Sequence, residues 1–218
     1  MDVFQRTMVT MADYVSRNRR YFIAAGTVFL VLVIIAAGYF WHRMNNERAA
    51  GALYAEAFSV SSAAAEDGGN TNLDVARGIY EELTEEYPDT TSGVLARYHM
   101  GNIYYKTGET EKAIASYQEF LDSVSEAHPL RLLAYSSLGY CFEKAGDIVE
   151  AIDAFLTATE LFSGGELEQY CLRNVARLYE ERGDKENARI YYEKILDTTD
   201  DPLLQKLVKR KIAMLGNK

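Results

Sequence analysis

The stretch that decides the fold runs from Tyr98 to Phe120 and reads YHMGNIYYKTGETEKAIASYQEF. It sets its smallest residues, Gly101, Gly108 and Ala113, among bulky aromatic ones, and it holds no side chains whose combination suggests chemistry. In a helical protein, small residues allow two helix backbones to approach closely, and glycine allows a helix to end. The pattern therefore predicts helix packing, not a reactive site.

The same order of small and large residues recurs twice further along the chain. It returns 38 residues later in YSSLGYCFEKAGDIVEAIDAFLTA and after a further 37 in LRNVARLYEERGDKENARIYYEKI. Upstream, LDVARGIYEELTEEYPDT keeps only the second half of the unit. In the three full copies the recurring small residues are Gly101, Gly108, Ala113, Gly139, Gly146, Ala151, Ala176, Gly183 and Ala188. Copies at one period predict about three and a half repeats of one structural unit.

Each unit is predicted to be two antiparallel helices joined by a tight turn. One glycine per unit is expected in the left-handed conformation that ends the first helix: Gly108, Gly146 and Gly183. The residues expected to cap the second helix are Thr110, Asp147 and Asp184. The other small residues are expected where the paired helices cross, and the aromatics one turn later are expected to fill the space beside them: Tyr117, Phe155 and Tyr192.

This pattern resembles the tetratricopeptide repeat family, whose period is about 34 residues and whose motif runs aromatic, Leu-Gly, aromatic, Gly, Ala, aromatic, Ala, Pro. The second copy matches best, at Tyr135, Leu138, Gly139, Phe142, Gly146, Ala151, Phe155 and Ala158. No proline closes that unit, and the longer period implies longer helices or loops. The resemblance covers residues 73–202 and implies an all-α solenoid of helix pairs; a plain bundle of amphipathic helices is the alternative. It says little about function, because this scaffold serves many partners.

The segment from Tyr21 to Trp41 is predicted to be a transmembrane helix. It runs for 21 residues without a charge, enough at about 1.5 Å per residue to cross a hydrocarbon core of about 30 Å. Four arginines precede it and two follow it closely, so the N-terminus is expected in the cytoplasm and the C-terminal part across the membrane. The alternative is a signal peptide cleaved after Ala36-Ala37-Gly38, but the apolar run exceeds the usual length of such a segment.

Five segments follow along the chain: a cytoplasmic tail 1–20, the transmembrane helix 21–41, a stalk helix and loop 42–72, the repeats 73–201 and a capping helix 202–218. The stalk is expected to stay helical to about Ala65, to break at Gly68-Gly69, and to act as the first packing partner of the repeats. The capping helix is expected to bury one apolar face, made of Leu203, Leu204, Leu207, Val208, Ile212 and Leu215. Its basic face leaves binding to an acidic lipid surface as the alternative role.

Composition argues against several classes of function. The net charge is −9, and because residues 1–41 carry +2, the rest carries −11, which disfavours nucleic-acid binding. Cys141 and Cys171 form no CxxC pair, so we expect two separate buried thiols; one disulfide between them is the alternative. The three histidines are scattered and no GxxxxGK[ST] or HExxH occurs. The sequence therefore predicts no enzyme, no metal, no cofactor and no small-molecule substrate.

Function is expected in a groove lined by the first helix of each unit, a shape suited to an extended or helical segment of another protein. The positions that the resemblance assigns to the groove include His99, Ser136, Glu143 and Asn174. The residues predicted to bind a partner are Tyr98, Asn102, Tyr105, Tyr140, Tyr170, Arg173 and Arg177. Tyrosines offer large contact area with few rotamers to freeze, and two arginines one turn apart suit a carboxylate. For each of them an ordinary structural role is the alternative.

The whole arrangement resembles bacterial inner-membrane proteins that accompany the Sec translocon and periplasmic chaperones. That resemblance is one of architecture, since no motif carries it. It implies a single-pass scaffold or chaperone-like accessory that binds proteins on the periplasmic side. The alternative is an assembly factor for a membrane or envelope complex, acting through the transmembrane span and the stalk.

Overall fold

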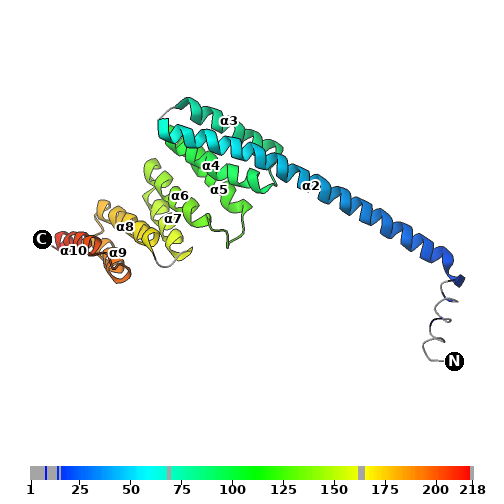
Figure 1. Ribbon diagram of the computed structural model, residues 1–218. Helices are drawn as coiled ribbons and strands as arrows, with labels where there is room; N and C mark the ends of the chain where they lie inside the picture. The colour runs from blue at the N-terminus through cyan, green and yellow to red at the C-terminus, as the bar shows by residue number, and fades with distance from the viewer. Residues whose placement is uncertain (1–7, 9–13, 15, 68–69, 162–164, 217–218) are drawn as a thin grey trace. The chain divides into compact units, whose positions relative to one another are not determined.

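The computed structural model describes residues 8, 14, 16–67, 70–161 and 165–216, and within them every regular element is an α-helix (Figure 1). This confirms the all-α prediction for the described residues. They fall into two compact units, Met1–Ala49 and Ala50–Lys218. The helices are α2 (Arg19–Asp67), α3 (Asn70–Glu86), α4 (Thr91–Thr107), α5 (Thr110–Ser123), α6 (Arg131–Ala145), α7 (Ile148–Leu161), α8 (Glu166–Glu181), α9 (Lys185–Thr198) and α10 (Pro202–Gly216).

The first unit holds the N-terminal part of α2. Of the helices that the structure describes, α2 is the one long and apolar enough to cross a membrane. Its most apolar window is entirely exposed. This finding is based on the length and the composition of α2 alone. A signal sequence near an N-terminus can be equally long and apolar.

The second unit is a stack of helix pairs in chain order (Figure 1). α4 packs on α5, α6 on α7 and α8 on α9, and each pair packs on the next. α3 lies against α4 at one end and α10 against α9 at the other. In each pair the aromatic ring one turn after the small residue of the second helix is almost completely buried: Tyr117, Phe155 and Tyr192. The core therefore runs from pair to pair, as the repeating sequence predicts.

Small residues let the paired helices meet. A Cβ atom on Gly101 would lie 2.7 Å from Cε1 of Tyr117, and one on Gly139 would lie 2.7 Å from the ring of Phe155. In the third pair, Ala176 shares a buried cluster with Tyr192. In the first two pairs the aromatic ring thus occupies the space that a side chain on the opposite helix would need.

Glycine ends the first helix in all three pairs. Gly108, Gly146 and Gly183 have φ of 87°, 88° and 76°, the left-handed region that costs glycine little. Each donates its N–H to the carbonyl three residues back, and the next residue donates to the carbonyl five residues back, with N–O distances of 2.8–3.3 Å. These bonds satisfy carbonyls that the end of a helix would leave free.

The second helices are capped in a less uniform way than predicted. Asp184 caps α9 by accepting a hydrogen bond from the backbone N–H of Asn187 (3.1 Å). Thr110 does not cap α5: it is the first residue of that helix, and Glu109 holds the cap position without a side-chain hydrogen bond to the backbone. The backbone oxygen of Asp147 accepts from Ala151 N at the start of α7. The prediction for Thr110 is wrong by one position, because α5, like α7 and α9, begins two residues after the glycine of its pair.

The C-terminal part of α2 belongs to the second unit. Ala50 and Ala57, seven residues apart, are fully buried in one cluster with Tyr80 of α3 and Ile103 of α4. α2 continues to Asp67, and the predicted break at Gly68-Gly69 lies outside the described residues. Helix α3 begins at Asn70, three residues before the predicted start of the repeats.

Helix α10 covers the last pair with a narrower face than predicted. Val208 is buried against Tyr192 and Ile195, and Leu204, Ile212 and Leu215 pack around it. Leu203 and Leu207, expected on the same face, are 79% and 50% exposed. At about 100° per residue they lie on a neighbouring side of the helix, so the prediction of one apolar face is wrong for these two residues.

Candidate protein-binding face

Helices α4, α6 and α8, the first helices of three successive pairs, carry all the residues that the sequence assigned to a groove. α4 contacts α6 directly. Side chains of α6 and α8 meet through the contacts described below. We call the surface that these three helices share the α4–α6–α8 face.

On α4, Tyr98 and Asn102 face the second helix of their own pair. The Tyr98 ring lies 5.7 Å from that of Tyr117 and 5.5 Å from that of Phe120. Burial raises the pKa of the Tyr98 hydroxyl. Asn102 Oδ1 accepts a hydrogen bond from Tyr117 Oη (2.8 Å). Both residues therefore support the pair, and only their outer atoms remain for a partner.

Tyr105 joins α4 to α6. Lys144 Nζ lies 5.0 Å from the centre of the Tyr105 ring and donates to the Tyr105 backbone oxygen (3.4 Å). A cation over an aromatic ring is attracted by its electron-rich face. The ring of Tyr105 stays half-buried, held in place from the next repeat.

Tyr140 and Tyr170 join α6 to α8. Asn174 Nδ2 donates to Tyr140 Oη (2.6 Å), and the two tyrosine rings lie 6.0 Å apart. Tyr140 also packs edge-on against Phe155, 5.0 Å away. Burial first, and then the neighbouring Tyr170, raise the pKa of the Tyr140 hydroxyl. Tyr140 thus stays a neutral hydrogen-bonding group on a fixed ring.

The two arginines of α8 have different environments. Arg177 binds Glu143 of α6 with both terminal nitrogens, each 2.7 Å from a carboxylate oxygen, and Nη1 also contacts Glu181 (2.9 Å). Hydrogen bonding to Glu143 is the main cause that raises the pKa of Arg177. Arg173 is exposed and its guanidinium lies 5.3 Å from the Tyr170 ring centre. The structure therefore brings Arg177 to a carboxylate of its own chain, while Arg173 remains accessible.

Sequence reasoning missed the contacts that α2 makes with α3 and α4 beside this face. Tyr54 Oη and His99 Nε2 share a hydrogen bond of 2.8 Å, and His99 stacks on Tyr80 with ring centres 5.2 Å apart. Phe58 lies edge-on to His99 at 5.8 Å. Beside them is a hollow of about 270 Å³ that Asn102 also lines. The signal was the spacing of Ala50, Tyr54, Ala57 and Phe58, a small-and-large helical pattern without the repeat glycines.

The described residues form no metal site and expose no reactive cysteine. Across residues 8, 14, 16–67, 70–161 and 165–216, no three His, Cys, Asp or Glu side chains come together in a way that could hold a metal ion. Cys141 and Cys171 are free and buried. Burial raises the pKa of the Cys141 thiol to about 11, which keeps the thiol protonated and poorly nucleophilic. The α4–α6–α8 face therefore offers a partner aromatic rings and polar side chains.

Comparison with known families agrees with this geometry. Two family profiles, each described as tetratricopeptide repeat, match residues 94–164 and 172–206. These two segments are similar to tetratricopeptide repeats. The matched residues span α4 to α9, so the α4–α6–α8 face is formed by helices of the segments that match this repeat. Such repeats are scaffolds for protein–protein interaction.

Several solved structures share the fold. A crystal structure of MamA is 20% identical with a TM-score of 0.55, over 67% of this chain and 78% of that one. MamA from Desulfovibrio magneticus RS-1 is 17% identical with a TM-score of 0.55, over 70% and 78%. Repeats of a putative kinesin light chain from Podospora anserina are 15% identical with a TM-score of 0.60, over 74% and 86%. At these identities the likeness concerns the fold alone. None of the curated protein sequences compared with the chain matches it.

Proposed function

We propose that this chain is a non-enzymatic, single-pass membrane scaffold that binds other polypeptides through its α4–α6–α8 face on the periplasmic side of a bacterial inner membrane. The observation that carries the proposal is a row of tyrosines, on three adjacent helices, whose rings are held by neighbouring repeats. Tyr105 is held by Lys144, and Tyr140 by Asn174. Rings that are already fixed lose little entropy when a partner binds, which favours affinity.

The chemistry of the face suggests its ligand. Tyr170 is 39% exposed and lies beside the accessible guanidinium of Arg173. Aromatic rings next to a cation suit a peptide that carries apolar side chains and an acidic group or a backbone carbonyl. Partners of this class include segments presented by the Sec translocon or by periplasmic chaperones.

The anchor and its orientation rest on α2. Its exposed apolar stretch is flanked by more arginines on the N-terminal side than on the C-terminal side, which favours a cytoplasmic N-terminus. Alkaline phosphatase fused after Lys218 should be active in cells, since the enzyme folds only outside the cytosol. An inactive fusion that is stable and membrane-bound would place the repeats in the cytosol and end this part of the proposal.

Site-specific photo-crosslinking in cells tests the binding face. A photoreactive phenylalanine at Tyr105 or Tyr170 should capture the same partner proteins, whereas the same group at Ala115, exposed on α5, should not. Replacing Tyr105 with Ala should then reduce capture from Tyr170. Equal capture from all three positions would show that the partner does not bind specifically to the α4–α6–α8 face.

An assembly factor that acts through its span would behave differently. The exposed apolar surface of α2 is the observation that keeps this function open. Exchanging residues 21–41 for an unrelated apolar span should leave capture from Tyr105 unchanged if the face binds the partner. The exchange must stop before Ala50 and Ala57, because both are buried in the repeat core. Loss of the partner on this exchange would favour the assembly factor.

A further inference from the structure

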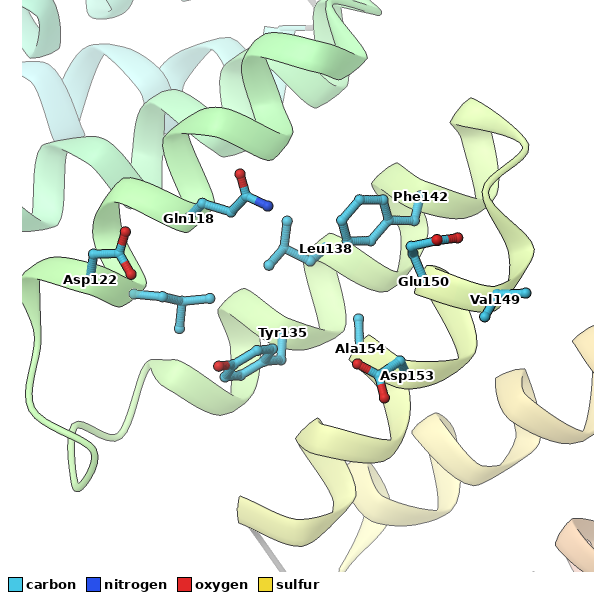
Figure 2. A pocket seen from close by; sticks show the side chains of 10 residues that line it. Gln118, Asp122, Tyr135, Leu138, Phe142, Val149, Glu150, Asp153 and Ala154 are labelled. Carbon is cyan, nitrogen blue, oxygen red and sulfur yellow. The ribbon is translucent and has the colours of Figure 1, made fainter.

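A second hollow, of about 670 Å³, lies between α5, α6 and α7. Tyr135, Leu138 and Phe142 of α6 line it, three and four residues apart, so they form one stripe along the helix (Figure 2). Tyr140 and Glu143, through which α6 binds Asn174 and Arg177 of α8, do not line this hollow. The hollow is therefore separate from the α4–α6–α8 face.

Three carboxylates stand around this apolar stripe. They come from Asp122 of α5 and from Glu150 and Asp153 of α7 (Figure 2). All three residues are exposed, and within the described part of the chain none of them forms a salt bridge. An occupant that fits would present apolar side chains flanked by positive charge.

Helix α10 of the same chain carries such a surface. Leu203, Leu207 and Met214 are 79%, 50% and 60% exposed, and their spacing of four and seven places them on one side of the helix. Lys206 precedes Leu207 by one residue, and Arg210 precedes Met214 by four. Both are exposed and form no salt bridge among the described residues. The strip therefore has apolar groups that can meet the stripe of α6 and cationic groups that can meet the acidic rim of the hollow.

The two surfaces also match in length. Leu207 and Met214 are seven residues apart on α10, as Tyr135 and Phe142 are on α6. Two turns of helix span about 10 Å in both cases. Leu207 and Met214 can therefore lie over the stripe of α6 while Lys206 and Arg210 reach the acidic rim.

We infer that α10 of one copy docks its Leu203–Leu207–Met214 strip in the α5–α6–α7 hollow of a second copy. The occupant comes from another copy because α10 packs on α9 of its own chain through Val208. Each copy then offers one α10 and one hollow, so the contact is head-to-tail and produces rings or open chains. This inference does not depend on the proposed function.

Disulfide trapping between two variants tests the head-to-tail contact. Full-length Leu207→Cys and full-length Asp153→Cys are purified in detergent and mixed under mild oxidation. The mixture should give at least about tenfold more crosslinked dimer than either variant alone, because the contact pairs unlike surfaces. Cys141 and Cys171 are buried and serve as an unreactive background. Ser125→Cys, exposed between α5 and α6, replaces Asp153→Cys as the matched control. Equal crosslinking of Leu207→Cys with itself would overturn the inference.

Charge reversal tests the same contact without cysteines. Asp122→Lys with Asp153→Lys, or Lys206→Glu with Arg210→Glu, should each weaken self-association of the full chain by about tenfold or more in sedimentation experiments. Mixing the two charge-reversed proteins should restore association between them. Far-UV circular dichroism confirms that the variants are folded. A chain that stays monomeric, or oligomers whose association neither charge reversal changes, would overturn the inference. Binding to phosphatidylglycerol nanodiscs is measured for the same proteins. If Lys206→Glu with Arg210→Glu weakened lipid binding but not self-association, the inference would also be overturned.

Discussion

Arg177 of α8 donates two hydrogen bonds of 2.7 Å to the carboxylate of Glu143 of α6, one from each terminal nitrogen of the guanidinium. The two residues are 34 positions apart and belong to successive repeats. Their side chains are only 33% and 27% exposed. A bidentate, partly buried pair holds two helices in one geometry, so it fixes the spacing of the α4–α6–α8 face between α6 and α8.

Breaking this pair should loosen the contact between two repeats. Arg177→Ala or Glu143→Ala should lower the free energy of unfolding by about 1–2 kcal/mol, because each leaves a partly buried charge without its partner. In a double-mutant cycle the coupling between the two should be about 1 kcal/mol. Chemical denaturation measures both quantities. A coupling near zero would mean that Glu181 alone satisfies Arg177.

Adding one methyl group to Gly139 should destabilise the second repeat. The Cβ of Gly139→Ala would lie 2.7 Å from the Phe155 ring, which is fully buried, so the ring or a helix must shift. The gain in helix propensity, about 1 kcal/mol, offsets part of the clash. A net loss of about 1–2 kcal/mol in unfolding free energy is expected.

Gly78 provides the matched control. It lies within α3, and a Cβ there would meet nothing within 4 Å. Gly78→Ala should therefore stabilise the chain by about 0.5–1 kcal/mol. If both substitutions changed stability in the same direction, close helix approach would not be the reason for Gly139.

The cysteines should react slowly in the folded chain. Both thiols are buried, and burial raises their pKa, that of Cys141 to about 11. Because the thiolate is the reactive form, iodoacetamide at pH 8 should modify neither residue until the chain unfolds. Mass spectrometry in the absence and presence of guanidinium chloride measures this. Fast labelling of the native chain would show that the helices around Cys141 open readily.

The repeated small residues made most of the fold predictable. Gly101 and Gly139 carry information about packing because an aromatic ring occupies the space that their side chains would need, and Gly108 and Gly146 because few other residues adopt a positive φ. These constraints act on single positions, so they are visible in the sequence. Leu203, in contrast, was assigned to the packed face of α10 from a hydrophobic count, which cannot separate two adjoining apolar sides of one helix.

The candidate face was predictable only in its location. Helical spacing placed Tyr105, Tyr140 and Arg177 on the first helix of each repeat. It did not predict which side chains of the neighbouring repeat contact them. The bond from Arg177 to Glu143 depends on how far one repeat is rotated against the next, which no local pattern encodes. The contribution of Tyr54 was missed for the same reason, since α2 carries no repeat motif and its packing on α4 is visible only in three dimensions.

Acid should weaken the first helices of the stack before the rest. His99 is held among Tyr54, Phe58, Tyr80 and Tyr98, and burial lowers its pKa to about 4 from an ordinary value of 6.5. The unfolded chain therefore takes up the proton more readily than the folded one. The resulting stabilisation is complete above about pH 6.5 and is lost as the pH falls to about 4, at most about 3 kcal/mol.

Hydrogen exchange at pH 7 and pH 5 locates this effect. Amides of α3 and α4 should lose more protection on acidification than those of α8 and α9, because the ring contacts of His99 described above come from α2, α3 and α4. Carboxylates titrate in the same range, so the informative quantity is the difference between the natural chain and His99→Phe, which keeps a ring on Tyr80 but cannot bind a proton. That variant should lose the extra acid sensitivity of α3 and α4. If its exchange at pH 5 matched that of the natural chain, His99 would not be the group that couples pH to the docking of α2.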